Sequence, residues 1–177
     1  MRVFFGIEPD PSTALAIGDW RDRQFGPAAR PVPVANLHLT LAFGGELALP
    51  AIDQLCERVD NWLAQTPPPA ACVLLDQTGY WPGNGLYWLG PRQWPDTLDR
   101  QAGKLRQLLA SAHTQRDRRR FQPHITLFRR CAQAPPLPAQ PPAISLQQRE
   151  IALFESRRQR EGVAYHVLTS WLLPQEP

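Results

Sequence analysis

Two short segments of this chain share the residue types that proton transfer requires. His38-Leu39-Thr40-Leu41 and His124-Ile125-Thr126-Leu127 both read histidine, apolar residue, threonine, leucine. Their histidines lie 86 residues apart in a chain of 177 residues, so each half carries one copy in nearly the same place. Matching segments at matching positions are typical of a duplicated unit.

The two segments predict a site for phosphodiester chemistry. In a strand, residues i and i+2 point to the same face, so each histidine has its threonine beside it. One imidazole can then accept a proton and the other donate one, while the hydroxyls donate hydrogen bonds to phosphate oxygens. The alternative is that each histidine is a lone structural residue. The occurrence of the same pair in both halves favours catalysis.

The charge balance suggests an anionic partner. The chain has 18 Arg, one Lys and 16 acidic residues, for a net charge of +3. Residues 111–177 carry 10 basic and 5 acidic groups, so the positive charge collects in the last third. Such a surplus is typical of proteins that bind nucleic acid. The alternative is a bias of a GC-rich genome toward arginine.

Several other classes of protein are excluded. No apolar run reaches the 18 residues that a membrane span needs, and the opening residues MRVFFGIEPDP lack a signal-peptide core, so we expect a cytoplasmic protein. The cysteines at 56, 72 and 131 fit neither a disulfide framework nor a zinc site. The sequence also lacks a phosphate-binding glycine loop with lysine. We therefore expect no metal and no nucleotide cofactor.

Hydrophobic periodicity predicts an α+β fold with antiparallel connections. Apolar residues recur every three or four positions in the expected helices, and β-prone runs bounded by Pro or Gly mark the strands. Gly44 and Gly45 are expected to stop the first motif strand. The expected helices cover residues 12–25, 50–65 and 94–112, and the expected strands cover 2–7, 37–43, 71–80, 86–89, 123–129, 144–154 and 163–173.

Five segments of the chain are informative together: MRVFFGI, NLHLTLAFGGEL, GYWPGNGLYWLG, FQPHITLFRR and LFESRRQREGVAYHVLTSWLL. They resemble the two-histidine phosphoesterases, and within them the RNA 2′,3′-cyclic phosphodiesterases of bacteria and archaea, also called 2′-5′ RNA ligases. The resemblance runs in order from about Arg2 to Leu173. It implies one domain over residues 1–177, made of two intertwined lobes related by a pseudo-twofold axis. Two antiparallel sheets flanked by helices would then form a groove with one motif on each side.

The resemblance also implies an activity. Members of the family hydrolyse a terminal 2′,3′-cyclic phosphate of RNA to a 2′-phosphate without metal or nucleotide cofactor. By motif position, His38 is the proton donor to the departing 3′ oxygen and His124 is the acceptor that activates water. Thr40 and Thr126 are then phosphate ligands. Relatives also join tRNA fragments through a 2′,5′ linkage, with an RNA 5′-hydroxyl replacing water as the nucleophile.

The partner implied is therefore RNA with 2′,3′-cyclic phosphate ends, tRNA fragments included, and we expect a monomer with no obligate protein partner. Two alternatives stay open. One is a two-histidine phosphoesterase for another cyclic nucleotide or a 2′,5′-linked oligonucleotide. The other is a module that binds RNA ends without turnover.

Two neighbouring arginines are candidates for binding the phosphate. Relatives often carry an arginine five places after the second histidine, which is Arg129 here. Strict strand alternation from His124 instead places Arg130 on the histidine's face. A β-bulge would rotate Arg129 onto that face. The sequence favours Arg129, with Arg130 as the alternative.

Weaker candidates for contacts with RNA or a base lie around the motifs. Phe43 occupies the place in the first motif that Arg129 has in the second, and it either stacks on a base or belongs to the core. Trp81 is a further stacking candidate, with core packing as the alternative. Arg118, Arg119 and Arg120 precede the second motif, where they either hold the RNA backbone or form a solvated loop.

Overall fold

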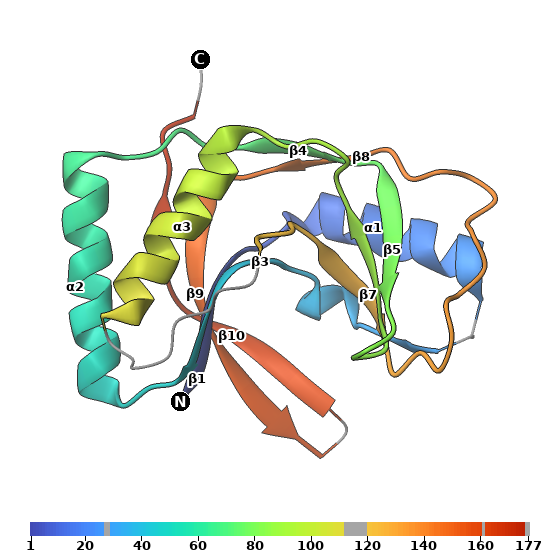
Figure 1. Cartoon of the computed structure of the whole chain (residues 1–177), viewed down its shortest axis with the longest axis horizontal. Helices are drawn as coiled ribbons and strands as arrows, with labels where there is room; N and C mark the ends of the chain where they lie inside the picture. The colour runs from blue at the N-terminus through green and yellow to red at the C-terminus, as the bar shows by residue number, and fades with distance from the viewer. Residues whose placement is uncertain (27–28, 112–119, 161, 176–177) are drawn as a thin grey trace.

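The computed structural model describes residues 1–26, 29–111, 120–160 and 162–175, shown in Figure 1. The helices are α1 (Pro11–Phe25), the 3-10 helix η1 (Val34–Asn36), α2 (Leu49–Gln65) and α3 (Asp96–Ala110). The strands are β1 (Arg2–Ile7), β2 (Arg30–Pro31), β3 (Leu39–Glu46), β4 (Cys72–Leu75), β5 (Gln77–Trp81), β6 (Leu86–Gly90), β7 (Ile125–Arg129), β8 (Ile144–Gln147), β9 (Glu150–Gln159) and β10 (Gly162–Leu172). The fold is α+β, as the sequence predicts.

Most strands follow one antiparallel path, β10-β9-β1-β3-β7-β6-β5, with β2 also paired to β7. We call β10-β9-β1-β3 the first half-sheet and β2-β7-β6-β5 the second half-sheet. Between β3 and β7 the pairing consists of a single position, Leu39 opposite Ile125. The two half-sheets therefore meet at the two motifs. Strands β4 and β8 form a separate two-stranded sheet.

The two half-sheets are covered by different helices. Helix α1 packs on the second half-sheet, where the Phe25 ring lies 5.2 Å from Tyr87 and 5.8 Å from Phe128. Helix α3 packs on β3 of the first half-sheet and against α2 (Figure 1). Most buried apolar residues of the two half-sheets belong to one hydrophobic cluster, so the two halves share a core.

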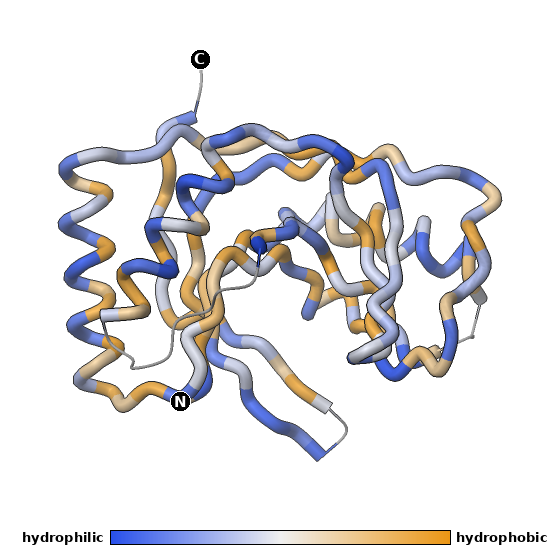
Figure 2. Tube along the Cα trace, viewed as in Figure 1, coloured by the Kyte–Doolittle hydropathy of each residue, from blue (hydrophilic) through white to orange (hydrophobic). Residues whose placement is uncertain are grey.

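Helix α2 shows why this sequence forms an amphipathic helix. Its buried residues Ile52, Leu55 and Val59 are spaced by three and four positions, which places them on one side. Figure 2 shows apolar and hydrophilic residues alternating around the turns of α2. Within the described part of the chain, no helix has the length and apolarity to cross a membrane.

The apolar residues of both motifs lie in the core. Leu39, Leu41, Ile125 and Leu127 are each no more than 1% exposed. Burying a leucine or isoleucine side chain contributes about 1.5 to 3 kcal/mol, so these positions fix which face of each strand points inward. The alternating histidines and threonines then point to the other face.

Strand β3 extends further than the sequence predicts. It continues through Gly44 and Gly45 to Glu46 instead of ending at Phe43. A Cβ atom on Gly44 would lie 2.9 Å from Cγ2 of Val3 and 3.0 Å from Cδ2 of Leu109. Gly44 therefore permits close packing between β1, β3 and α3, and it does not break the strand.

The strand expected over 71–80 is wrong as one element, because it is divided at Asp76 between two sheets. The Asp76 backbone N–H donates to the Gly90 carbonyl at 3.1 Å. Its carboxylate accepts a hydrogen bond from the Arg92 backbone N–H at 2.7 Å. These bonds turn the chain, so β4 pairs with β8 while β5 pairs with β6.

The strand expected over 144–154 is likewise divided, at Gln148. This side chain is buried and donates to Oε1 of Gln101 at 2.8 Å. It also accepts from the Ala71 backbone N–H at 2.9 Å. A buried amide is stable only when its polar atoms are paired, so these contacts interrupt the strand between β8 and β9.

Candidate active site

The pairing between β3 and β7 sets the arrangement of the four motif residues. Leu39 lies opposite Ile125 in an antiparallel pair. Counting outward from that pair, the position of His38 is opposite that of Thr126, and Thr40 is opposite His124. The histidines and threonines therefore lie crosswise about one local two-fold axis. We call the side of the sheet on which they lie the histidine face.

Both histidines are held by the same backbone contact. The His38 Nδ1–H donates to the Asn36 carbonyl at 2.8 Å, and the His124 Nδ1–H donates to the Gln122 carbonyl at 2.8 Å. A carbonyl oxygen only accepts, so Nδ1 carries the hydrogen in each ring. Each Nε2 is thereby left to exchange a proton with a bound molecule.

Aromatic rings surround His38. The ring centroids of Phe4 and Tyr165 lie 4.7 Å and 4.6 Å from that of His38, and Phe154 lies at 5.9 Å. These rings come from β1, β10 and β9, the three other strands of the first half-sheet. They remove water from much of the imidazole surface.

Indole rings take the corresponding place beside His124. Trp81 from β5 lies 4.5 Å from the His124 ring at an interplanar angle of 77°, and Trp88 from β6 lies at 6.3 Å. The structure thus places Trp81 against a motif histidine, and its role in stacking on a base stays a proposal. Trp88 is 8% exposed, and Gly79 lies directly over its indole.

The surroundings of the two rings disfavour the imidazolium form. Burial, the Arg129 charge and the His124 charge together lower the pKa of His38 to about 4. Burial and the Arg129 charge also lower the pKa of His124 from its ordinary value. Both rings are therefore mainly neutral at pH 7 in the free protein.

A β-bulge decides which arginine reaches the histidine face. On β7, Thr126 lies opposite Trp88 and Phe128 lies opposite Tyr87, so Leu127 is an extra residue. The alternation shifts by one position, which brings Arg129 to the side of His124. Its Nη2 donates to the Tyr165 hydroxyl at 3.2 Å.

The neighbouring Arg130 lies beyond this point. It is exposed and has a φ of 58°, in the left-handed region. The positive charge of Arg129 contributes to the lowered pKa of both His38 and His124, so the Arg129 guanidinium lies near both rings. Binding of phosphate by Arg129 stays a prediction.

The first motif contains the same bulge. On β3, Thr40 lies opposite Gly6 and Ala42 lies opposite Phe5, so Leu41 is the extra residue. Phe43 therefore occupies the place that Arg129 has on β7. It is 50% exposed and its ring lies 6.4 Å from that of Phe4, so Phe43 is not part of the buried core.

The arginine run before the second motif is described only in part. Arg118 and Arg119 lie outside the described residues. Arg120 is exposed and adjoins Phe121, whose ring has the Arg106 guanidinium 5.7 Å from its centroid. Contact of these arginines with RNA stays a prediction.

Sequence reasoning missed two residues beside the motifs. Tyr165 contacts both the His38 ring and Arg129, and Asn36 holds the His38 ring through its carbonyl. Tyr165 is one of several alternating residues of β10, and its spacing relative to either motif carries no signal. Asn36 acts through its backbone, which residue type does not reveal.

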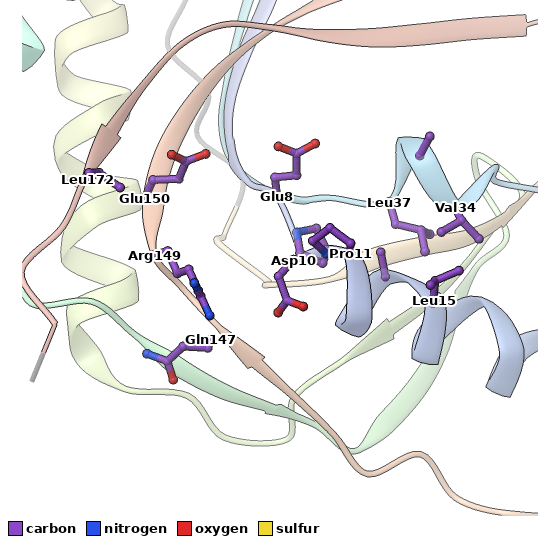
Figure 3. Close-up of a pocket in the computed structure, with 13 residues that line it drawn as sticks. Glu8, Asp10, Pro11, Leu15, Val34, Leu37, Gln147, Arg149, Glu150 and Leu172 are labelled. Atoms are coloured by element: carbon purple, nitrogen blue, oxygen red, sulfur yellow. The ribbon is translucent and has the colours of Figure 1, made fainter.

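A cavity of about 820 Å³ opens elsewhere, where α1, η1, β9 and β10 come together (Figure 3). Glu8, Glu150 and Arg149 line it with leucines, and none of the four motif residues is among its lining. Burial and the Glu150 charge raise the pKa of Glu8. Among the described residues, no group of three or more His, Cys, Asp or Glu side chains is placed to hold a metal ion.

Comparison with known proteins identifies relatives over the whole fold. The chain is 36% identical to the RNA 2′,3′-cyclic phosphodiesterase of Escherichia coli (strain K12), over 98% of this chain and 97% of the relative. It is 35% identical to E. coli LigT complexed with 3′-AMP, with a TM-score of 0.88 and 98% of each chain covered. TT0787 of Thermus thermophilus is 27% identical, with a TM-score of 0.76 and 100% of each chain covered. The pattern of the 2′-5′ RNA ligase superfamily matches residues 9–159, and the chain belongs to this superfamily.

Proposed function

We propose that this protein is an RNA 2′,3′-cyclic phosphodiesterase that hydrolyses a terminal cyclic phosphate to a 2′-phosphate. The observation that carries the proposal is the matched pair of histidines. Each ring donates its Nδ1–H to a carbonyl at 2.8 Å, which leaves Nε2 to act on a substrate. The E. coli relative has this activity in its name, over nearly the whole of both chains.

The reaction divides between the two rings. Nε2 of His124 takes a proton from water as the water oxygen bonds to phosphorus. The bond between phosphorus and the 3′ oxygen breaks, and Nε2 of His38 gives that oxygen its proton. The hydroxyls of Thr40 and Thr126 donate to the nonbridging oxygens, and Arg129 balances their negative charge. The product is a 2′-phosphate and a free 3′-hydroxyl.

The acid form of His38 arises when the substrate binds. In the free protein the lowered pKa keeps this ring neutral at pH 7. A cyclic phosphate carries one negative charge, and a negative charge beside the ring favours the imidazolium. The same anion also offsets the Arg129 charge that disfavours protonation.

The whole chain acts as one domain in this proposal, because the site takes one motif from each half-sheet. The substrate class is RNA with a 2′,3′-cyclic phosphate end, and tRNA fragments belong to that class. When an RNA 5′-hydroxyl replaces water as the nucleophile, the same displacement of the 3′ oxygen forms a 2′,5′ linkage, in line with the superfamily name. The chain works as a monomer, since each of the proposed groups comes from one copy.

The test uses an oligoribonucleotide with a 2′,3′-cyclic phosphate in the presence of EDTA, with the product identified by phosphorus NMR. We expect a 2′-phosphate, and losses of about 10² to 10⁴ in kcat for His38→Ala and for His124→Ala. His166→Ala is the matched control, because this exposed histidine lies on β10 beyond the motifs. A 3′-phosphate product, loss of activity in EDTA, or full activity in either motif variant would contradict the proposal.

A further inference from the structure

Strand β10 brings one side chain into contact with both His38 of the first motif and Arg129, which follows the second motif. The Tyr165 ring lies 4.6 Å from the His38 ring at an interplanar angle of 73°. Its hydroxyl accepts a hydrogen bond from Nη2 of Arg129 at 3.2 Å. Figure 1 shows the paired strands β9 and β10 extending together beyond the helices. Tyr165 thus joins a residue of β7 to the histidine that precedes β3.

Asn36, which precedes His38, holds β10 in this position. Nδ2 of Asn36 donates to the Val163 carbonyl at 2.8 Å, two residues before Tyr165. The Asn36 carbonyl accepts the His38 Nδ1–H. One residue therefore fixes both the imidazole and the strand that carries Tyr165. The Phe4 ring, edge-to-face with Tyr165 at 5.3 Å, adds a second support.

The hydroxyl of Tyr165 restricts a side chain that is otherwise flexible. A free arginine side chain loses rotamer entropy when a ligand immobilises it. The bond from Nη2 to Tyr165 immobilises Arg129 before any ligand arrives. A guanidinium has five N–H donors, so the remaining ones stay available for phosphate oxygens.

The ring of Tyr165 has a separate effect, on His38. It is one of the rings that cover the imidazole, and burial is the largest cause of the lowered pKa. The hydroxyl and the ring therefore act on different groups. Two substitutions can separate these effects, because Phe removes only the hydroxyl and Leu removes the ring as well.

We propose that Tyr165 is a positioning residue of the phosphate site, whose hydroxyl holds Arg129 ready for the phosphate and whose ring encloses His38. The inference rests on the proposed function for its substrate. It assigns to the β9–β10 hairpin a direct part in the site, beyond the two motifs.

The first test measures phosphate binding and turnover in Tyr165→Phe. We expect the Kd for inorganic phosphate and the KM for the cyclic phosphate each to rise about fivefold, the equivalent of one hydrogen bond. We expect kcat to change less than twofold. Tyr87→Phe is the matched control, because its hydroxyl bonds to Thr78 at 2.8 Å and its ring packs with Phe25 in the core.

A double-mutant cycle shows whether the effect passes through Arg129. In an Arg129→Ala background, Tyr165→Phe is expected to leave phosphate affinity unchanged. Tyr165→Leu is expected to move the NMR titration of the His38 ring to higher pH, whereas Tyr165→Phe leaves it in place. A residue with a merely structural role would change the melting temperature without producing this division.

The outcomes separate the two proposals. Unchanged phosphate affinity in Tyr165→Phe, or an equal loss with and without Arg129, would overturn the inference, whether or not Tyr165→Leu folds. Coupling between Tyr165 and Arg129 in phosphate binding, without any turnover of a cyclic phosphate by the unaltered protein, would reject the proposed function and leave the inference standing.

Discussion

Protonation of His38 and binding of an anion should depend strongly on each other. Burial, the Arg129 charge and the His124 charge lower the pKa of His38 to about 4 in the free protein. At pH 7 about one His38 ring in a thousand is then protonated, and protonating a neutral ring costs about 4 kcal/mol. An anion on the histidine face supplies part of this free energy, so the pKa must rise when the anion binds.

Sulfate is a suitable probe, because it resembles phosphate and does not titrate in this range. The inhibition constant of sulfate against a cyclic phosphate substrate should rise by up to about tenfold per pH unit above pH 4. The rise should stop once the pH exceeds the pKa of His38 in the sulfate-bound protein. NMR of the protein with ¹⁵N-labelled histidine should show the His38 ring titrating near pH 4 without sulfate and at higher pH with it.

The variant His38→Asn provides the control. Its side-chain amide can replace the Nδ1–H that donates to the Asn36 carbonyl, and it cannot be protonated. Most of the pH dependence of sulfate binding should disappear, leaving the share of His124. The reasoning fails if His38 titrates near its ordinary pKa in the free protein, or if sulfate inhibition of the unaltered protein is independent of pH.

Three further perturbations test other parts of the site. In Gly79→Ala, the new Cβ would lie 2.1 Å from Cζ2 of Trp88. We therefore expect the free energy of unfolding in urea to fall by about 1 to 3 kcal/mol and kcat to fall as well. An unchanged unfolding free energy and kcat would refute this packing. Because the pKa of His38 is lower in the folded state than in the unfolded state, its contribution to stability is complete above about pH 6.5 and lost as the pH falls through about 4. This loss is worth up to about 3 kcal/mol. The midpoints of urea unfolding at pH 7 and pH 4 should therefore differ less in His38→Asn than in the unaltered protein. Thr126→Val should lower kcat by about 10² to 10³ with little change in melting temperature, and a loss confined to KM would argue against a donor to the transition state.

The motif residues and the central strands were accessible from the sequence because they follow local rules. Strand β1 has the expected bounds, Arg2–Ile7, since an apolar β-prone run ends there at Glu8 and Pro9. The face of the sheet on which Thr40 and Thr126 lie follows from their alternation with buried leucines and isoleucines. The family resemblance supplied the pseudo-twofold arrangement, which single-strand patterns do not contain.

Other features depend on contacts between distant residues. The expected strands over 71–80 and 144–154 break where Asp76 and Gln148 bond to other segments, and an alternating pattern does not record such bonds. The extra residue Leu127 is visible only in the pairing of β7 with β6. Tyr165 reaches the site through the course of β10, which local sequence does not specify.

The crosswise placement of the motif residues has a consequence for regiochemistry. Rotation about the local two-fold axis that passes between Leu39 and Ile125 exchanges His38 and Thr40 with His124 and Thr126. Such a core offers the 2′ and 3′ oxygens of a cyclic phosphate equivalent partners. The choice of which bond opens therefore belongs to the residues that break the symmetry, with Arg129 on one side where Phe43 stands on the other.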